Sequence, residues 1–128
     1  YEIYKDHSLN RFNKDSDKDE FITTFYTESC PSLQSEFYLN DELIAIGFLD
    51  ITSIALSSVY FIYKTEYEDF SPGTFSILKE IEYAASLNMK YYYLGYYIEN
   101  NPSMSYKNNF YPHELYNWLK KEWMLIKK

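Results

Sequence analysis

The stretch from Tyr91 to Lys107 holds the side chains best suited to chemistry in this sequence. It reads YYYLGYYIENNPSMSYK, which is rich in tyrosine and carries one glycine, one glutamate and one lysine. Buried strands are normally filled with aliphatic residues, whereas each buried tyrosine hydroxyl requires a hydrogen-bond partner. We expect a strand from Tyr91 to Ile98 and an Asn-Asn-Pro turn that leads back to Tyr106 and Lys107. The composition of this stretch predicts a polar pocket.

Two upstream segments add further polar side chains. Asp50 closes the apolar run ELIAIGFLD, either as a turn aspartate at the strand end or as an acid held at the rim of a pocket. In the run LSSVYFIY, alternation places two sets of side chains on opposite faces, namely Ser57, Val59 and Phe61, and Ser58, Tyr60 and Ile62. Neither serine lies in a Gly-x-Ser-x-Gly elbow. We therefore expect Ser57, Ser58 and Tyr60 to act as hydrogen-bonding or positioning groups.

The elements that must position these residues begin with two helices. Residues 1–12 show a weak helical spacing of apolar side chains, and Asp17 or Asp19 is placed to cap a second helix that ends before Pro31. The aromatic residues of both segments predict helix packing. His7 falls near the apolar face and is interpreted as structural.

A hairpin, a further strand and a third helix follow. Segments 35–39 and 42–51 predict the hairpin, with Asn40 and Asp41 in its turn, and segment 56–63 predicts the next strand. An acidic loop, 64–70, precedes the strongest helical pattern. In that helix, four apolar side chains recur on one face, namely Phe75, Leu78, Ile81 and Ala85.

The C-terminal segment predicts one more helix and one more strand. Residues 113–121 are interpreted as a short helix, because Leu115, Trp118 and Leu119 follow a helical spacing. Residues 123–126 predict a final strand before a basic tail. The sequence has no internal repeat.

Composition and charge restrict the classes of function. The 128 residues suffice for one domain, and the first residue is a tyrosine, so we expect a piece of a longer protein. A single cysteine excludes an internal disulfide and a cysteine metal cluster. We expect no metal site. With no apolar run long enough to span a membrane and no signal-peptide pattern, a cytoplasmic location is expected.

The charge is unevenly distributed along the chain. The net charge is −7, which disfavours nucleic-acid binding by the chain as a whole. Residues 1–70 carry 5 basic and 14 acidic side chains, whereas residues 71–128 carry 7 and 5. Any contact with tRNA is therefore expected in the second half.

Several separated blocks, in one order, resemble a known family. GYYIEN followed by MSYK is similar to the signature of the N-end-rule aminoacyl-tRNA:protein transferases, which comprise arginyltransferases and bacterial leucyltransferases. ELIAIGFLD, LSSVYFIY and SPGTFSILKEIE resemble the same family's C-terminal domain. The resemblance implies a single α+β domain over residues 1–128, with a mixed sheet flanked by helices as in acetyltransferases of the GNAT superfamily. The family's cysteine-rich N-terminal domain has no counterpart in this chain.

The resemblance also implies a reaction and its partners. Family members transfer an amino acid from aminoacyl-tRNA, the co-substrate, to the N-terminal α-amine of proteins that begin with Asp or Glu. The ester is already activated, so no cofactor is expected. The site must keep the amine neutral, although its ordinary pKa is about 8, and stabilise the oxyanion that develops. Proximity of the two substrates supplies much of the remaining rate enhancement.

The residues that match the family motifs receive roles on that basis. Tyr96, Tyr97 and Tyr106 are expected to line the site with Lys107 as its cation, whereas a solvated loop lysine is the alternative interpretation of Lys107.

Three further residues complete the predicted site. Asp50 and Glu99 are candidates to accept the proton of the amine or to pair with an arginyl group. Gly95 either allows a close backbone approach or marks a strand bulge.

Two other functions stay open at this point. A small-molecule N-acyltransferase using acyl-CoA would share the fold, but the segment before the third helix reads only SPGT, without the glycine-rich basic loop of those enzymes. A non-catalytic module that binds acidic N-termini is the other alternative. The choice between an arginine and a leucine donor is also open.

Overall fold

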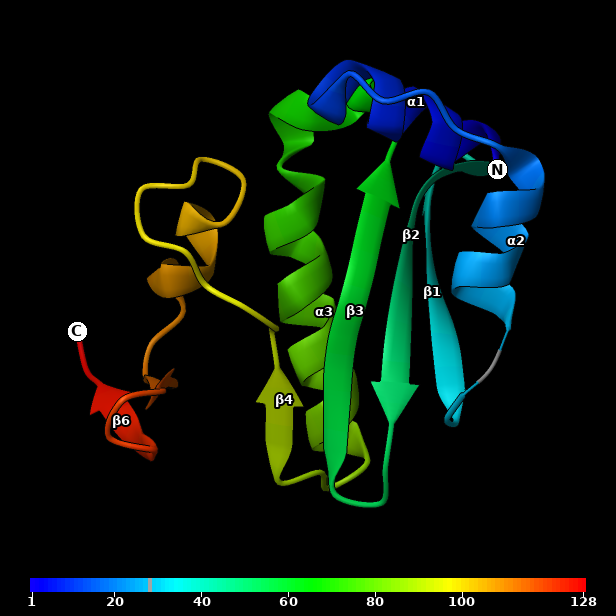
Figure 1. Cartoon of the computed structure of the whole chain (residues 1–128). Helices are drawn as coiled ribbons and strands as arrows, with labels where there is room; N and C mark the ends of the chain where they lie inside the picture. The colour runs from blue at the N-terminus through cyan, green and yellow to red at the C-terminus, as the bar shows by residue number, and fades with distance from the viewer. Residues whose placement is uncertain (28) are drawn as a thin grey trace. The chain divides into compact units, whose positions relative to one another are not determined.

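The computed structural model describes residues 1–27 and 29–128 (Figure 1). The chain divides into two compact units, Tyr1–Gly95 and Tyr96–Lys128. The boundary falls inside the tyrosine-rich stretch. Each unit is described by itself.

The first unit is built on a four-stranded mixed sheet in the order β1-β2-β3-β4. β1 (Ser32–Leu39), β2 (Glu42–Ile51) and β3 (Ala55–Tyr63) pair antiparallel, and β4 (Tyr91–Tyr93) runs parallel to β3. The hairpin and the strand after it are confirmed. Asn40 and Asp41 both have positive φ, as the tight turn between β1 and β2 requires. Helices and a mixed sheet in one chain confirm the predicted α+β class.

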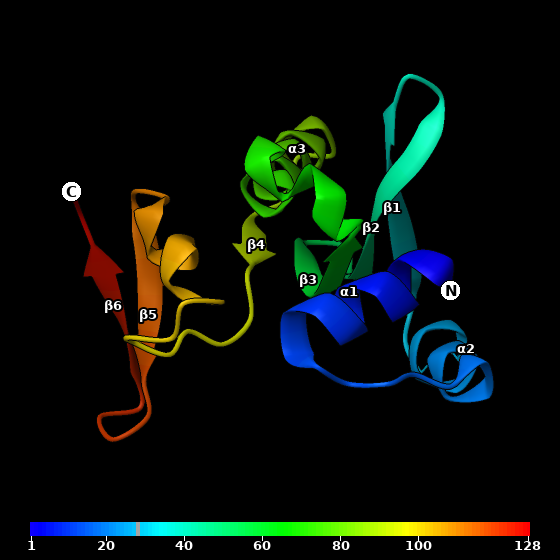
Figure 2. The ribbon, with the colours of Figure 1, turned by 90° about the horizontal axis from the view of Figure 1, so that it is seen from above.

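Helices cover both faces of this sheet (Figure 2). α1 (Glu2–Phe12) and α2 (Lys18–Tyr26) lie on one face, and α3 (Pro72–Ser86) lies on the other, after the 3-10 helix η1 (Thr65–Phe70). Asp17 caps α2 as predicted, because its carboxylate accepts a hydrogen bond from the Asp19 amide. No helix within the described residues combines the length and the apolar character needed to cross a bilayer.

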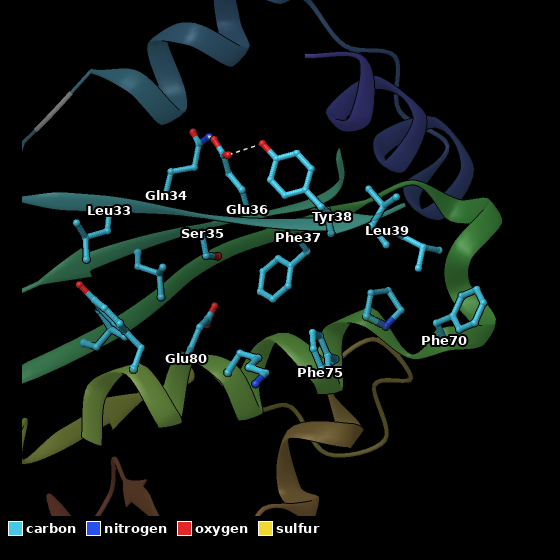
Figure 3. Close-up of a pocket in the computed structure, with 17 residues that line it drawn as sticks. Leu33, Gln34, Ser35, Glu36, Phe37, Tyr38, Leu39, Phe70, Phe75 and Glu80 are labelled. Atoms are coloured by element: carbon cyan, nitrogen blue, oxygen red, sulfur yellow. Dashed lines mark hydrogen bonds between the residues drawn. The ribbon is translucent and has the colours of Figure 1, made fainter. Parts of the chain in front are cut away.

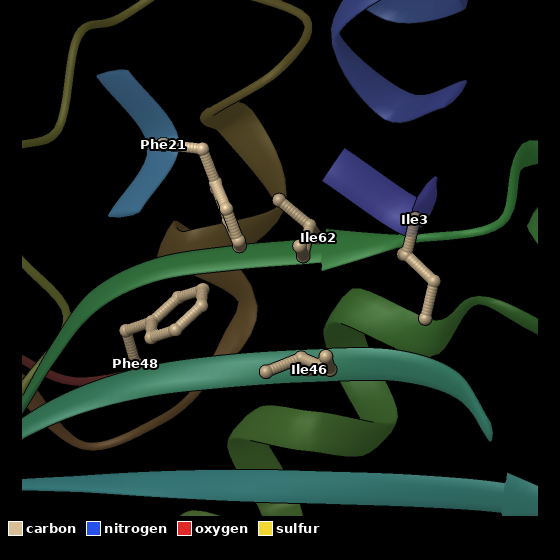
Figure 4. Close-up of a cluster of buried hydrophobic side chains, with 5 residues drawn as sticks. All are labelled: Ile3, Phe21, Ile46, Phe48 and Ile62. Carbon is tan, nitrogen blue, oxygen red and sulfur yellow. The ribbon is translucent and has the colours of Figure 1, made fainter. Parts of the chain in front are cut away.

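Two clusters of buried apolar side chains hold these layers together. One lies between the sheet and the first two helices (Figure 4) and comprises Ile3, Phe21, Ile46, Phe48 and Ile62. The other lies between the sheet and α3 and comprises Leu49, Leu56 and Ala84. Since Phe48 and Leu49 are neighbours in β2, their membership of different clusters follows from the alternation of side chains along a strand.

α3 buries a different face from the one on which its apolar residues recur. Ser76, Ile77, Glu80 and Ala84 are buried, whereas Phe75, Leu78 and Ile81 of the predicted apolar face are 50%, 53% and 39% exposed. An amphipathic surface helix normally turns its apolar stripe inward. Here Ser76, Ile77, Glu80 and Ala84 lie on the buried face, and the predicted apolar residues stay partly exposed.

A bulge in β3 breaks the predicted alternation of that strand. Phe48 pairs with Tyr60 and Leu49 pairs with Ser58, so Val59 is the extra residue. Because directly opposed residues share a face, Ser58 faces the α3 side with Leu49 and Tyr60 faces the other side with Phe48. The prediction that Ser58 and Tyr60 share a face is therefore wrong.

β4 ends five residues earlier than the predicted strand from Tyr91 to Ile98. Only Tyr91–Tyr93 pair with β3. Gly95 has a φ of 79°, a conformation that is accessible to glycine and interrupts an extended strand. Residues 94–98 are irregular as a result.

The second unit contains a short 3-10 helix and a hairpin. η2 (Ser105–Asn109) is followed by β5 (His113–Asn117) and β6 (Glu122–Ile126), which pair antiparallel. The final strand is confirmed, but the helix predicted over residues 113–121 is wrong. Asn117 closes the turn of the hairpin, because its side-chain oxygen accepts hydrogen bonds from the backbone amides of Leu119 and Lys120.

Candidate functional site

The predicted site residues divide between the two units. The first unit contains Asp50, Ser57, Tyr60 and Gly95, and the second contains Tyr96, Tyr97, Glu99, Tyr106 and Lys107. The structure thus brings together two separate sets of residues. Each set is described in its own unit below.

Asp50 and Ser57 are directly opposed on neighbouring strands. They form a register pair between β2 and β3, and both are half-buried. Asp50 lies within β2 rather than in a turn, and it lines a pocket of about 310 Å³ between the sheet and the end of α2. Since Asp50 is two residues from Phe48, the pair lies on the face that α1 and α2 cover. The carboxylate is placed at a pocket, the second of the two interpretations of Asp50.

Tyr60 lies on the same face, surrounded by aromatic rings. Its ring centroid is 5.3 Å from that of Phe25 and 6.5 Å from that of Tyr4. Burial, with a smaller contribution from Tyr4, raises the pKa of the Tyr60 hydroxyl. Tyr60 packs against the core cluster and keeps its proton at neutral pH, so it can donate a hydrogen bond.

Gly95 allows the chain to change direction beside β3. A Cβ added there would meet the Ser58 carbonyl oxygen at 3.9 Å, an ordinary contact distance. The positive φ, not a lack of space, is therefore the reason for glycine. This residue ends the first unit and leads directly to Tyr96.

Lys107 lies close to Tyr96 in the second unit. Its Nζ donates a hydrogen bond to the Tyr96 carbonyl oxygen at 3.1 Å. Burial lowers the pKa of the Lys107 ammonium, and the residue is half-buried. Although the two residues are eleven positions apart, the structure brings them together as the sequence predicted for one site.

A turn between Tyr96 and Lys107 allows these two residues to form their hydrogen bond. The Asn101 backbone oxygen accepts hydrogen bonds from the amides of Met104 and Ser105, and its side-chain oxygen accepts one from the Ser103 amide. The chain therefore reverses after Glu99 and enters η2, which carries Tyr106 and Lys107. This confirms the predicted turn.

The remaining residues of this set differ in exposure. Tyr96 is 74% exposed, and Glu99 is also exposed. Tyr97 and Tyr106 are half-buried. The Tyr96 ring and the Glu99 carboxylate are thus accessible for contact with a substrate, whereas Tyr97 and Tyr106 are partly enclosed.

The segment before α3 carries negative side chains. η1 contains Glu66, Glu68 and Asp69, and Glu68 forms an ion pair with Arg11 at 2.8 Å. Pro72 occupies the first turn of α3 and supplies no amide hydrogen. These features disfavour binding of a pyrophosphate at this helix N-terminus.

Sequence reasoning missed a larger cavity between α3 and the sheet (Figure 3). The α3 cavity, as we name it, measures about 840 Å³, and its walls include Ser35 and Phe37 of β1 and Phe75 and Glu80 of α3. Glu80 escaped attention because the apolar spacing pointed to another face of the helix. The available signal was a glutamate between Ile77 and Ala84, on the face where small residues recur.

Glu80 is a buried carboxyl group of this cavity. It is 3% exposed, and burial raises its pKa to about 7, whereas a hydrogen bond from the Tyr92 hydroxyl at 2.9 Å opposes that rise. Strongly perturbed carboxyl groups in cavities are candidates for functional sites.

Comparisons with known proteins identify the family. The family model described as "Arginine-tRNA-protein transferase, C terminus" matches residues 1–117. Arginyl-tRNA--protein transferase 1 of Drosophila melanogaster is 42% identical over 98 residues, covering 69% of this chain and 20% of that protein. Aspartate/glutamate leucyltransferase of Pseudoalteromonas atlantica is 41% identical over 96 residues, covering 75% of this chain and 41% of that protein.

A third relative shows the same partial coverage. Aspartate/glutamate leucyltransferase of Campylobacter jejuni is 39% identical over 79 residues, which cover 62% of this chain and 33% of that protein. The chain thus spans between a fifth and two fifths of the length of these relatives. The family model nevertheless covers nearly all of the chain. The chain therefore belongs to the arginine-tRNA-protein transferase family and corresponds to the C-terminal region of its members.

Proposed function

We propose that the protein containing this chain transfers an amino acid from aminoacyl-tRNA to the N-terminal α-amine of proteins that begin with Asp or Glu. The match of the family model to residues 1–117 is the observation that carries the proposal. The Drosophila relative, an arginyl-tRNA--protein transferase, supports an aminoacyl-tRNA donor. The Pseudoalteromonas relative, an aspartate/glutamate leucyltransferase, supports Asp and Glu as acceptors. The product is a protein marked for degradation by its new first residue.

The reaction is the aminolysis of an ester. The neutral α-amine attacks the carbonyl carbon of the aminoacyl ester, a C–N bond forms, and the C–O bond to the terminal ribose of the tRNA breaks. The amine loses a proton and the ribose hydroxyl gains one, so the step is balanced without an oxidant or a metal. Alignment of the two substrates and stabilisation of the oxyanion are the main requirements. We propose that the reaction uses no cofactor.

Lys107 is the cation of the proposed site. Its half-buried ammonium interacts more strongly with an anion than a fully solvated one does, and its hydrogen bond to Tyr96 holds it in place. We assign it to the acidic side chain of the acceptor or to the ester oxyanion. Tyr97 and Tyr106 are proposed as the accompanying hydrogen-bond donors.

A carboxylate is needed to accept the proton of the amine. Asp50 lines a pocket and faces Ser57, whereas Glu99 is exposed in the second unit. We propose Asp50 and Glu99 for this role or for pairing with an arginyl donor, with Ser57 and Tyr60 as positioning groups and Gly95 as the point of close backbone approach. Carboxylate oxygens accept hydrogen bonds, so an aspartate or a glutamate can orient the attacking amine and receive the proton that it loses.

The same family contains arginine and leucine transferases, and both kinds of relative match this chain. An arginyl pocket requires a carboxylate, whereas a leucyl pocket requires apolar walls. We place the reaction in the cytoplasm, where charged tRNA is available and where a chain with a single cysteine needs no disulfide.

The test is a transfer assay with the intact protein. Arginyl-tRNA and leucyl-tRNA, labelled in the amino acid, are each mixed with peptides that begin with Glu or Ala and are otherwise identical. Transfer to the Glu peptide alone supports the proposal and identifies the donor. Lack of transfer from both tRNAs contradicts it.

Two controls address the other functions considered. A thermal-shift experiment with coenzyme A tests an acyl-CoA-dependent enzyme, and the acidic residues around η1 predict no shift. Peptide binding measured without tRNA tests a non-catalytic module. Such a module would bind the Glu peptide and never discharge the tRNA.

A further inference from the structure

The α3 cavity is a feature of the first unit to which the proposed reaction assigns no role. None of the residues predicted for transfer lines it. Its volume of about 840 Å³ lies within the range of small-molecule sites, which are mostly apolar with a few convergent polar groups. Phe37 and Phe75 supply apolar walls from opposite sides, with their ring centroids 5.9 Å apart. The size and the lining match a ligand site.

Two buried oxygen atoms meet at one side of this cavity. Figure 3 shows Ser35 pointing from β1 toward α3, and Glu80 pointing back toward it. Ser35 Oγ and Glu80 Oε1 are buried and have no hydrogen-bond partner among the described residues. A Cβ added at Gly47 would lie 2.3 Å from Ser35 Oγ and 3.2 Å from Glu80 Oε1, so both atoms border the same point.

These two atoms call for a hydrogen-bond donor. A carboxylate oxygen accepts hydrogen bonds, and a serine hydroxyl accepts as well as donates. Leaving buried polar atoms unsatisfied is unfavourable, and a donor that enters from the cavity removes that penalty. Glu80 Oε2 already accepts a hydrogen bond from the Tyr92 hydroxyl, so Oε1 is the oxygen that requires a donor.

The charges around Glu80 favour a cationic donor. Lys79, the neighbouring residue on α3, forms an ion pair with Glu82 at 3.0 Å and lies over the ring of Phe75. Glu36 on β1 accepts a hydrogen bond from the Tyr38 hydroxyl, and both side chains lie on the side of the strand opposite Ser35, as Figure 3 shows. The Glu80 carboxyl group is therefore not neutralised by a lysine, and an ammonium ion in the cavity would stabilise its ionised form.

We propose that the α3 cavity binds a primary ammonium group attached to an apolar body. The ammonium hydrogen-bonds to Glu80 and Ser35, and the apolar body packs against the touching rings of Phe37 and Phe75. Two sources share this chemistry: a simple apolar amine, and an apolar amino acid whose carboxyl group is blocked as an amide. A free amino acid is disfavoured because its carboxylate would approach Glu80. The site is independent of the transfer reaction and is testable without tRNA.

The first experiment compares three ligands by NMR titration of the ¹⁵N-labelled chain at neutral pH. Leucinamide carries the ammonium and a blocked carboxyl group, isocaproamide has the same skeleton without the amine, and isopentylamine has the amine without the amide. We expect saturable shifts in α3 and β1, with leucinamide binding at least ten-fold more tightly than isocaproamide. If isopentylamine binds with the same affinity as leucinamide, the ligand is a simple amine. If isopentylamine binds ten-fold more weakly than leucinamide, the ligand is a blocked amino acid.

Variants of the chain test the role of the carboxylate. Glu80→Gln preserves the size of the side chain and an acceptor for Tyr92, and it should weaken leucinamide binding at least ten-fold without affecting isocaproamide. Glu20→Gln removes an exposed carboxylate from α2 and should change neither. If Glu80→Gln does not fold, Ser35→Ala replaces it, with an expected weakening of about three-fold for leucinamide alone. Three outcomes would overturn the proposal: equal binding of leucinamide and isocaproamide, an unchanged affinity for leucinamide in Glu80→Gln or in its substitute Ser35→Ala, or shifts confined to elements other than α3 and β1.

Discussion

Gly47 on β2 lies against Ser35 of β1 and Glu80 of α3, where there is no space for a larger side chain. A methyl group there would overlap Ser35 Oγ at 2.3 Å and press on Glu80 Oε1 at 3.2 Å. Gly47→Ala should therefore lower the free energy of unfolding by about 1–3 kcal/mol, the usual effect of overpacking. Urea denaturation measures this loss.

The same contact predicts strong coupling between two substitutions. Ser35→Ala removes the oxygen that the new methyl group would meet, so adding it to Gly47→Ala should restore about 1 kcal/mol or more. Ser8→Ala, a buried serine on α1 at a distance from Gly47, is the control and should add no such recovery. Simple additivity of Gly47→Ala and Ser35→Ala would show that the strain lies elsewhere.

Glu80 and His7 predict opposite effects of pH on stability. The pKa of Glu80 rises from 4.5 to about 7 on folding, so the folded state binds more protons between these values and stability falls as pH rises through that window. The pKa of His7 falls from 6.5 to about 4, mainly through burial, so stability falls as pH drops from 6.5 to 4. Each shift corresponds to about 3 kcal/mol at most.

Single variants separate these two contributions. Relative to Glu80→Gln, the unmodified chain should lose stability as the pH rises from 4.5 to about 7. Relative to His7→Gln, which keeps an acceptor for the Tyr63 amide, it should lose stability on acidification below 6.5. Urea midpoints measured across this range give both differences. Curves that run parallel to those of either variant would exclude the corresponding group as the cause.

Lys107 is the residue on which the proposed transfer depends most directly. Lys107→Ala in the intact protein should reduce kcat/KM for a Glu-starting peptide at least a hundred-fold, because the anion loses its partly buried cation. Lys107→Arg retains the charge and should keep part of the activity. Lys120→Ala, an exposed lysine of the same unit, is the matched control. Normal transfer by Lys107→Ala would remove this residue from the site.

At the level of elements, α3 shows how spacing can identify a helix and misidentify its buried face. Ile77 is 3% exposed and Ile81 is 39% exposed, although it is Ile81 that belongs to the predicted apolar face. Ile77→Ala should lower the free energy of unfolding by about 2–4 kcal/mol, whereas Ile81→Ala should cost about 1 kcal/mol or less. Thermal or urea unfolding of the two variants checks the assignment. A larger loss at Ile81 would reverse it.

Local sequence predicted the helices and strands of the first unit, because their caps, turns and apolar runs agree with one another. Asp17 begins α2, and the turn at Asn40 and Asp41 joins β1 to β2, as expected. The bulge at Val59 was not predictable, because it depends on the register with β2. It places Ser57 on the face of Tyr60 and Asp50, whereas alternation along β3 would have put Ser57 on the face opposite Tyr60.

The hairpin of β5 and β6 was mistaken for a helix for a similar reason. Leu115, Trp118 and Leu119 match a helical period, but Leu119 is 96% exposed at the hairpin turn. Short segments fit both periods, and pairing with another strand decides between them. For the candidate site, motif resemblance supplied the residues, and the structure supplied the contact of Lys107 with Tyr96 and the Asp50–Ser57 pair. Whether these residues act in transfer stays a prediction.

For the whole molecule, the distribution of buried residues predicts which part folds alone. Both apolar clusters lie in residues 1–95, and the described residues of 96–128 include none classed as buried. The fragment 1–95 should therefore give a dispersed NMR spectrum and cooperative unfolding. The fragment 96–128 falls below the length of about 40 residues at which a chain usually needs added support, so it should be unfolded in isolation.

This expectation bears on the reaction, because the predicted site residues occur on both sides of the boundary. The protein truncated after Gly95 retains Asp50, Ser57 and Tyr60 but lacks Lys107, so it should not catalyse transfer. Adding fragment 96–128 in trans should restore little activity, because that fragment must order itself on binding. Loss of cooperative unfolding in 1–95 would show instead that residues 1–128 form the single domain expected from the sequence. Independent folding of 96–128 would contradict the prediction for that fragment and show a second domain.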